Sequence, residues 1–252
     1  MFNKAILIPI SDKRNFIFKY YINFNKSALK YAQCIRDLTC PAIEHFFLPL
    51  HPYPMKQLNN HRKIVLASQS PRRKQLLEDA GFSITVRATD VEESFPDHMP
   101  VREVPEYLAH KKALAAITNL SPDELIIASD CVVILEGVIY NKPADYHDAV
   151  SILKKLSGKM HEVITGVCIM DHQKTSLFSG VSKVFFAELS DEEIGYYIEK
   201  YQPYDKAGAY AIQEWIGLCK IKKIEGTYSN IMGLPMDLVY ERLLEFLSEK
   251  SI

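Results

Sequence analysis

The chain has 252 residues and a mass of 28.8 kDa, enough for one large domain or two small ones. Hydrophobic residues make up 48% of it, charged residues 24%, and the net charge is −1 at pH 7. This composition excludes collagen-like, mucin-like and acidic-tail proteins, and the near-neutral charge argues against a protein that binds nucleic acid or a membrane surface through a strong positive field.

The first 54 residues differ from the rest. They hold seven basic and three acidic residues and no glycine, which folded segments usually need for positive-φ turns. The apolar run 5–10 is too short for a signal sequence, and no stretch reaches the roughly 20 apolar residues of a membrane span. We therefore expect 1–54 to be a poorly structured, dispensable extension, with Met55 as a candidate native start, and 55–252 to be the functional domain.

The cysteines carry little information about export. There are five of them, widely spaced, with no CxxC pair and no Cys/His zinc spacing. This pattern is typical of reduced thiols, so we expect a cytoplasmic protein. The eight histidines form no triad-like or metal-like cluster in the sequence.

From residue 63 onward the pattern alternates between strands and helices. An apolar run predicts a buried strand over 63–67, and Ser70-Pro71 predicts a helix start, with Gly81 at its end. The following segments predict a strand over 82–88, a helix over 104–118 and a buried strand over 125–128.

The second half continues in the same way. The pattern predicts a hairpin of 131–135 with 138–140, then a helix over 145–156, strands over 162–170 and 181–188, a helix opened by the capping box of Ser190 and Glu193, and a last helix that starts at Pro235. The mixture predicts an α/β fold with a central sheet between helices.

A basic cluster follows the first strand. Ser68, Ser70, Arg72 and Arg73 stand at the start of a predicted helix. Cations there oppose the helix dipole, whereas a bound phosphate would be held by backbone N–H groups, hydroxyls and guanidiniums together. The segment lacks the glycines of a Walker loop. It predicts a phosphate site, and the alternative is a solvated basic helix end.

Acidic residues supply a second set of candidates. Asp130 follows the predicted strand 125–128, where open α/β sheets bind ligands, and such a carboxylate holds Mg²⁺ or accepts a proton from water. An Asp that merely turns the chain is the alternative. The loop from Asp90 to Glu93 would repel a phosphate unless a metal lies between them, and is otherwise a solvated loop.

Further candidates are polar residues on helices and loops. Lys112 lies on the apolar stripe of the helix 104–118, so it either extends to solvent or meets a buried anion. Lys142 precedes a proline and, like Lys112 taken alone, is typical of a surface lysine. Lys206 follows Asp205 in a loop of small residues that permits close approach to a ligand. Gln213 offers an amide that could pair with a base edge.

Together these segments resemble the Maf family of nucleoside triphosphate pyrophosphatases. The resemblance runs from about residue 63 to the last helix. It rests on the segments Leu66–Arg73, Leu108-Ala109 with Lys112-Ala113, Ser129-Asp130, Lys142-Pro143, Leu156–Gly158, Thr165–Val167, Asp205–Tyr210 with Ile212-Gln213, and Gly233–Pro235.

The resemblance implies an elongated mixed β-sheet flanked by helices, in two lobes around a cleft, as in the inosine-triphosphatase-like fold. It implies hydrolysis of a nucleoside triphosphate to the monophosphate and pyrophosphate. Asp130 would be the proton acceptor, and Glu93 with Asp130 would hold a divalent metal cation, Mg²⁺ or Mn²⁺. The triphosphate would be bound by Ser68, Arg72, Arg73, Lys112 and Lys142. The resemblance is compatible with a homodimer.

The residues favour one branch of the family. Arg72, Asp205, Lys206 and Gln213 match the branch that acts on dTTP and UTP, which implies a housecleaning role in nucleotide metabolism. Cys131 stands where that branch usually has threonine, at a position expected to influence specificity together with Arg72 and Gln213, and Glu214 replaces a usual glycine. The alternatives are a 7-methyl-GTP-type pyrophosphatase of the same family and a nucleotide-binding regulator of septum formation without turnover.

Overall fold

The computed structural model describes residues 62–248 of the chain. The predicted extension over 1–54 lies outside the described residues. Within 62–248, no helix has the length and apolar character that a membrane crossing requires.

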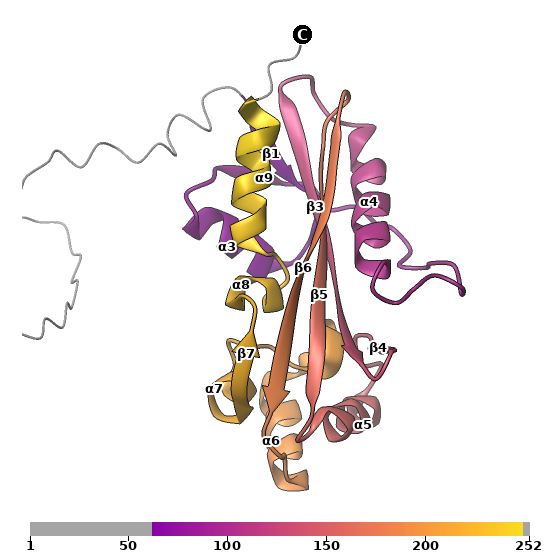
Figure 1. Ribbon diagram of the computed structural model, residues 1–252, viewed down its shortest axis with the longest axis vertical. Helices are drawn as coiled ribbons and strands as arrows, with labels where there is room; N and C mark the ends of the chain where they lie inside the picture. The colour runs from indigo at the N-terminus through magenta and orange to yellow at the C-terminus, as the bar shows by residue number, and fades with distance from the viewer. Residues whose placement is uncertain (1–61, 249–252) are drawn as a thin grey trace, which may run out of the picture. The chain divides into compact units, whose positions relative to one another are not determined.

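A mixed sheet runs through the described part of the chain (Figure 1). Its strands follow the order β2-β1-β3-β5-β6-β7, and β4 pairs with β3. β1 is parallel to β2 and β3, and the other pairs are antiparallel. The strands are β1 (Lys63–Leu66), β2 (Ile84–Val86), β3 (Glu124–Leu135), β4 (Val138–Tyr140), β5 (Met160–Met170), β6 (Thr175–Phe186) and β7 (Ile221–Glu225).

Helices flank this sheet, and the sequence predicts the first four and the last of them. They are α3 (Pro71–Asp79), α4 (Val104–Ile117), α5 (Tyr146–Leu156), α6 (Asp191–Tyr201), α7 (Trp215–Lys220), α8 (Tyr228–Ile231) and α9 (Met236–Ser248). The side chains of Ser70, Asp145 and Ser190 cap α3, α5 and α6, and the predicted capping box at Ser190 is present. These caps satisfy N–H groups that a helix start leaves unpaired.

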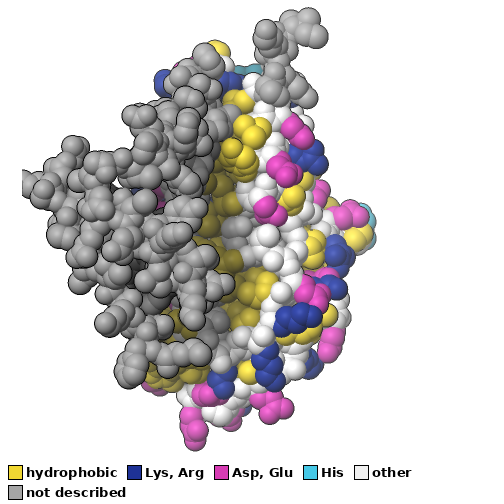
Figure 2. Space-filling view, turned by 60° about the vertical axis from the view of Figure 1, so that its left-hand side comes forward, with side chains coloured by type: hydrophobic (Ala, Val, Ile, Leu, Met, Phe, Trp, Pro, Cys, Tyr) yellow, Lys and Arg dark blue, Asp and Glu magenta, His cyan; other side chains and the backbone are white. Residues whose placement is uncertain are grey.

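The alternation of side chains along β3 decides which helices each face contacts. Leu125 and Ile127 pack in one cluster with residues of α3 and α9, whereas Ile126 and Ala128 pack with alanines of α4. This half of the sheet therefore lies between α4 on one face and α3 and α9 on the other (Figure 1). On the face shown in Figure 2, acidic and basic side chains of the described residues are interspersed.

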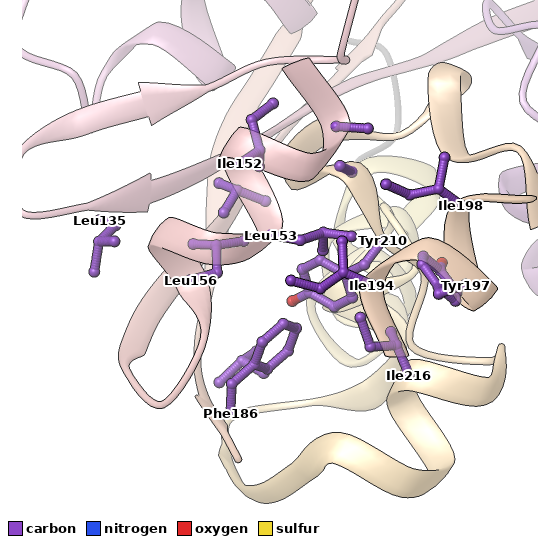
Figure 3. Packing of buried hydrophobic residues seen from close by; sticks show 14 of the residues in the cluster. Leu135, Ile152, Leu153, Leu156, Phe186, Ile194, Tyr197, Ile198, Tyr210 and Ile216 are labelled. Carbon is purple, nitrogen blue, oxygen red and sulfur yellow. The ribbon is translucent and has the colours of Figure 1, made fainter. Parts of the chain in front are cut away.

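The other half of the long strands carries its own core. Leu135 of β3 belongs to one buried cluster with residues of α5 and α6, and within it Leu153 and Leu156 of α5 lie toward Ile194 of α6 (Figure 3). The buried residues thus fall into separate clusters toward the two ends of β3, which gives the two lobes that the family resemblance implies.

One expectation about β3 is wrong. Asp130 does not follow the end of a strand, because β3 continues without a break from Glu124 to Leu135. Antiparallel pairing with β5 runs through this region, with Asp130 opposite Gly166, so the backbone stays in the sheet. The strand that ends here is β1, whose last residue, Leu66, lies opposite Ile127.

Candidate active site

A cleft of about 640 Å³ opens beside the middle of β3. Its walls come from α3, α4, β3, the loop before α4 and the segment after α6. Every side chain selected from the sequence as a site residue lines it: Ser68, Arg72, Arg73, Glu93, Lys112, Asp130, Cys131, Lys142, Asp205, Lys206 and Gln213. Residues up to 145 positions apart in sequence therefore meet at one place.

Two carboxylates in this cleft share the ammonium group of Lys112. The Nζ atom of Lys112 is 2.5 Å from Oδ1 of Asp130 and 2.8 Å from Oε1 of Glu93. Lys142 approaches the same glutamate, with 3.4 Å between its Nζ and Oε2. Lys112 thus meets the buried carboxylate of Asp130 and the more exposed one of Glu93 rather than extending to solvent, so of the two expectations for this lysine the buried anion is the correct one.

The strand register and Gly166 allow α4 to lie beside Asp130. Asp130 lies on the same face of β3 as Ile126 and Ala128, which is the face covered by α4. Gly166, its partner on β5, has no side chain, and a Cβ atom there would be 2.2 Å from the backbone of Pro105 at the start of α4. The missing side chain lets the helix lie against the sheet, within reach of Asp130.

The charge of Glu93 is set by opposing effects. Burial acts to raise the pKa of its carboxyl, but the hydrogen bond and charge of Lys112, with those of Lys142, outweigh burial and lower the pKa below its ordinary value. Glu93 is therefore ionised at neutral pH.

The basic cluster at the start of α3 faces the same cleft. Arg73 donates from Nε to the carbonyl oxygen of Gly233, at 2.8 Å, and from its Nη1 atom to Ser68 Oγ, at 3.1 Å. Burial lowers the pKa of Arg73, while the nearby charge of Asp130 raises it. An arginine starts from so high a pKa that its guanidinium stays charged. These contacts fix the guanidinium plane beside the serine hydroxyl.

Arg72 contacts the wall of the cleft that the segment after α6 forms. Its Nη1 atom is 3.2 Å from Oδ2 of Asp205, and the other oxygen of Asp205 is 2.7 Å from Lys206 Nζ. Burial acts to raise the pKa of Asp205, but its bonds to Lys206 and Arg72 lower it overall. Gln213 is exposed at the rim.

Cys131 lies next to Asp130 on β3 and is partly buried. Burial raises the pKa of its thiol, although a hydrogen bond with Thr165 and the charge of Arg73 act in the other direction. The sulfur is therefore a neutral thiol at neutral pH, a weaker hydrogen-bonding group than a hydroxyl.

The donor set fits a hard divalent cation shared with phosphate. Glu93 and Asp130 offer carboxylate oxygens, and Mg²⁺ in nucleotide enzymes usually takes one or two carboxylates together with phosphate oxygens. No group of three or more His, Cys, Asp or Glu side chains that could hold a metal occurs within 62–248. The pair would therefore hold a cation together with a substrate rather than alone.

Sequence reasoning missed the role of Gly233. Its carbonyl oxygen accepts hydrogen bonds from Arg73 and from Ser129, whose Oγ is 3.3 Å away, so it links α3 to β3 beneath the cleft. The available signal was the Gly-Leu-Pro segment before the last helix, where Gly233 has a φ of 105° that favours glycine.

Known proteins resemble this chain over most of its length. A family model described as "Maf-like protein" matches residues 63–246. A protein of Phocaeicola vulgatus named "dTTP/UTP pyrophosphatase" is 50% identical over 182 residues, which cover 72% of this chain and 94% of that protein. A protein of Cytophaga hutchinsonii with the same name is 48% identical over 180 residues, or 71% of this chain and 82% of that protein.

Among solved structures, the Staphylococcus aureus Ham1 protein aligns with a TM-score of 0.36 and 20% identity, over 50% of this chain and 72% of that one.

Proposed function

We propose that this chain, which belongs to the Maf family, hydrolyses dTTP and UTP to the nucleoside monophosphate and pyrophosphate. The observation that carries the proposal is one cleft in which the carboxylates of Glu93 and Asp130 face a group of cations. The substrates come from the names of relatives that are 48–50% identical.

Asp130 is the proton acceptor in this proposal. Its carboxylate is fixed in direction by Lys112, so it can orient a water molecule and take up the proton as the water attacks the phosphorus. Phosphoryl transfer needs mainly positioning and charge neutralisation, which a rigid carboxylate beside a set of cations supplies.

The triphosphate chain would lie along the cationic wall. Arg73 and Ser68 would bind the phosphates together, because the guanidinium is already hydrogen-bonded to the hydroxyl. A guanidinium can also form paired hydrogen bonds with phosphate oxygens. Arg72, Lys112 and Lys142 supply further positive charge on the same cleft. A Mg²⁺ or Mn²⁺ ion held by Glu93 and Asp130 would neutralise charge that develops on the phosphates.

The nucleotide base would be selected by Gln213, Arg72 and Cys131. The exposed amide of Gln213 can donate and accept hydrogen bonds at once, as the edge of thymine or uracil requires. Arg72 and Cys131 are the other residues proposed to set specificity. Hydrolysis of free nucleotides, including modified pyrimidine nucleotides, is a cytoplasmic housecleaning activity that needs neither nucleic acid nor membrane.

The test is release of pyrophosphate by the purified full-length chain. We expect turnover of dTTP and UTP with Mg²⁺ or Mn²⁺, and much slower turnover of 7-methyl-GTP and dATP. Preferential turnover of 7-methyl-GTP would overturn the substrate assignment. Absence of turnover with every nucleotide would overturn the proposal that the chain is an enzyme.

A further inference from the structure

Glu214 lies behind the cleft wall, and both of its carboxylate oxygens contact residues of other segments. Oε1 is 3.5 Å from Lys206 Nζ, and Oε2 accepts a hydrogen bond from the hydroxyl of Tyr197. Glu214 stands at the N-cap position of α7 yet makes no capping bond, although a helix start offers free N–H groups. Its carboxylate is thus directed to Lys206 and Tyr197 instead of its own helix.

Lys206 needs such a partner because its side chain is only 9% exposed. A buried ammonium is costly unless it is paired and hydrogen-bonded. Asp205 contacts it at 2.7 Å, but that carboxylate is 60% exposed and also binds Arg72. The Glu214 side chain is 17% exposed, so it offers Lys206 a second and better sheltered negative charge.

Tyr197 anchors the other side of Glu214. It lies on α6 within the core shown in Figure 3, and its hydroxyl also accepts a hydrogen bond of 3.0 Å from the backbone N–H of Ala211. Burial raises the pKa of Tyr197, so its hydroxyl remains a donor to the carboxylate. The position of Glu214 is therefore set by the core of this lobe.

These contacts form a chain of alternating charge that ends at the cleft. It runs from Glu214 to Lys206, Asp205 and Arg72, and the last three line the cleft while Glu214 does not. We propose that Glu214 is a positioning residue for nucleotide binding, which holds Lys206 in the wall and thereby keeps Asp205 and Arg72 where the nucleotide meets them. The inference rests on the function proposed above.

Kinetics of the full-length chain test the proposal. Glu214→Gln keeps the size of the side chain and an acceptor for Tyr197 but loses the charge. We expect the KM for dTTP to rise about tenfold with kcat within about twofold, the pattern of lost binding without lost chemistry. Glu214→Asp should recover part of the loss. The matched control is Glu225→Gln on β7, which removes an ion pair with Lys223 outside the cleft and should leave KM unchanged.

A second substitution separates positioning from folding. In a Lys206→Met background, Glu214→Gln should raise KM no further, because the group it acts through is gone. An equal further rise would overturn the proposal, as would a Glu214→Gln enzyme with the KM of wild type. A merely structural role would lower Tm and the fraction of active enzyme while KM stayed constant.

The outcomes also separate this inference from the proposed function. Wild-type turnover of dTTP together with an unchanged KM in Glu214→Gln removes only the role of Glu214. If wild type turns over no nucleotide, the proposed function fails. Calorimetric titration with dTTP then tests Glu214, with the same expected tenfold change, now in Kd, and an unchanged Kd would overturn its role.

Discussion

The Nζ atom of Lys112 lies 2.5 Å from Oδ1 of Asp130, so an ion pair joins α4 to β3 at the floor of the cleft. Both side chains are about nine-tenths buried, at 12% and 10% exposure. The pair fixes the direction of the carboxylate, since a buried ammonium and carboxylate cannot exchange partners with water at little cost.

Asp130→Asn should lower kcat by about 10²–10⁴-fold, because the amide cannot accept the proton of the attacking water. The similar shape should leave dTTP binding measurable by calorimetry. Pyrophosphate release gives kcat. Full activity in this variant would remove Asp130 from the mechanism.

Arg73→Lys should lower kcat/KM about 10- to 100-fold, because a lysine cannot contact the Gly233 carbonyl and Ser68 Oγ in one fixed plane. Lys74→Arg is the matched exchange on the same helical turn. Lys74 is half exposed and is 3.7 Å from Glu78, so its exchange should change kcat/KM by less than about twofold. Equal effects of the two exchanges would argue against a specific site at Arg73.

Gly166→Ala should destabilise the fold by about 1–3 kcal/mol, because the new Cβ atom would meet the backbone of Pro105. It should also lower kcat, since displacement of α4 moves Lys112 away from Asp130. Gly195→Ala on α6 is the control. The nearest atom to its Cβ, the Tyr146 hydroxyl oxygen, is 3.5 Å away, so it should gain about 0.5–1 kcal/mol of helix stability. Urea unfolding measures both, and a Gly166→Ala protein as stable as wild type would contradict the packing argument.

His161 should make the fold acid-sensitive. Burial lowers its pKa to about 3, whereas the unfolded chain takes up this proton near pH 6.5. Between pH 3 and pH 6.5 the unfolded state therefore binds more protons than the folded state. The contribution of His161 to the free energy of unfolding is fully present above pH 6.5 and is lost as the pH falls toward 3.

His161→Gln should reduce the pH dependence of the free energy of unfolding, by up to about 1.4 kcal/mol per pH unit. The amide can still contact the Tyr210 hydroxyl, which is 2.8 Å from His161 Nε2. Free energies of unfolding at pH 7 and pH 4.5 give the comparison, with the exposed His147→Gln as control. An unchanged difference between the two pH values in His161→Gln would refute the assignment.

Much of the fold could be predicted because its signals are local. Ser70, Asp145 and Ser190 mark helix starts through their caps, and Glu136-Gly137 marks the hairpin between β3 and β4, where both residues have positive φ. The candidate site residues could be selected one by one, since each belongs to a recognisable segment.

What could not be predicted depends on partners far away in sequence. The early part of β6 carries Ser176, Ser179 and Gly180, which do not indicate a strand, and within 62–248 it is pairing with β5 that holds this part in the sheet. The helices α7 and α8 have six and four residues, too few for a hydrophobic period. The continuity of β3 through Asp130 likewise depends on the register with β5.

The ion pair between Arg72 and Asp205 joins residues 133 positions apart and belongs to both lobes. A nucleotide held against both residues would therefore act as a brace between α3 and the segment that follows α6. Because the nucleotide binds only when both regions are in place, it would suppress the local unfolding events in which these two regions separate. Amide hydrogen exchange in the two regions should then slow together on ligand binding, so that occupancy of the cleft becomes visible as a coupled change in local stability.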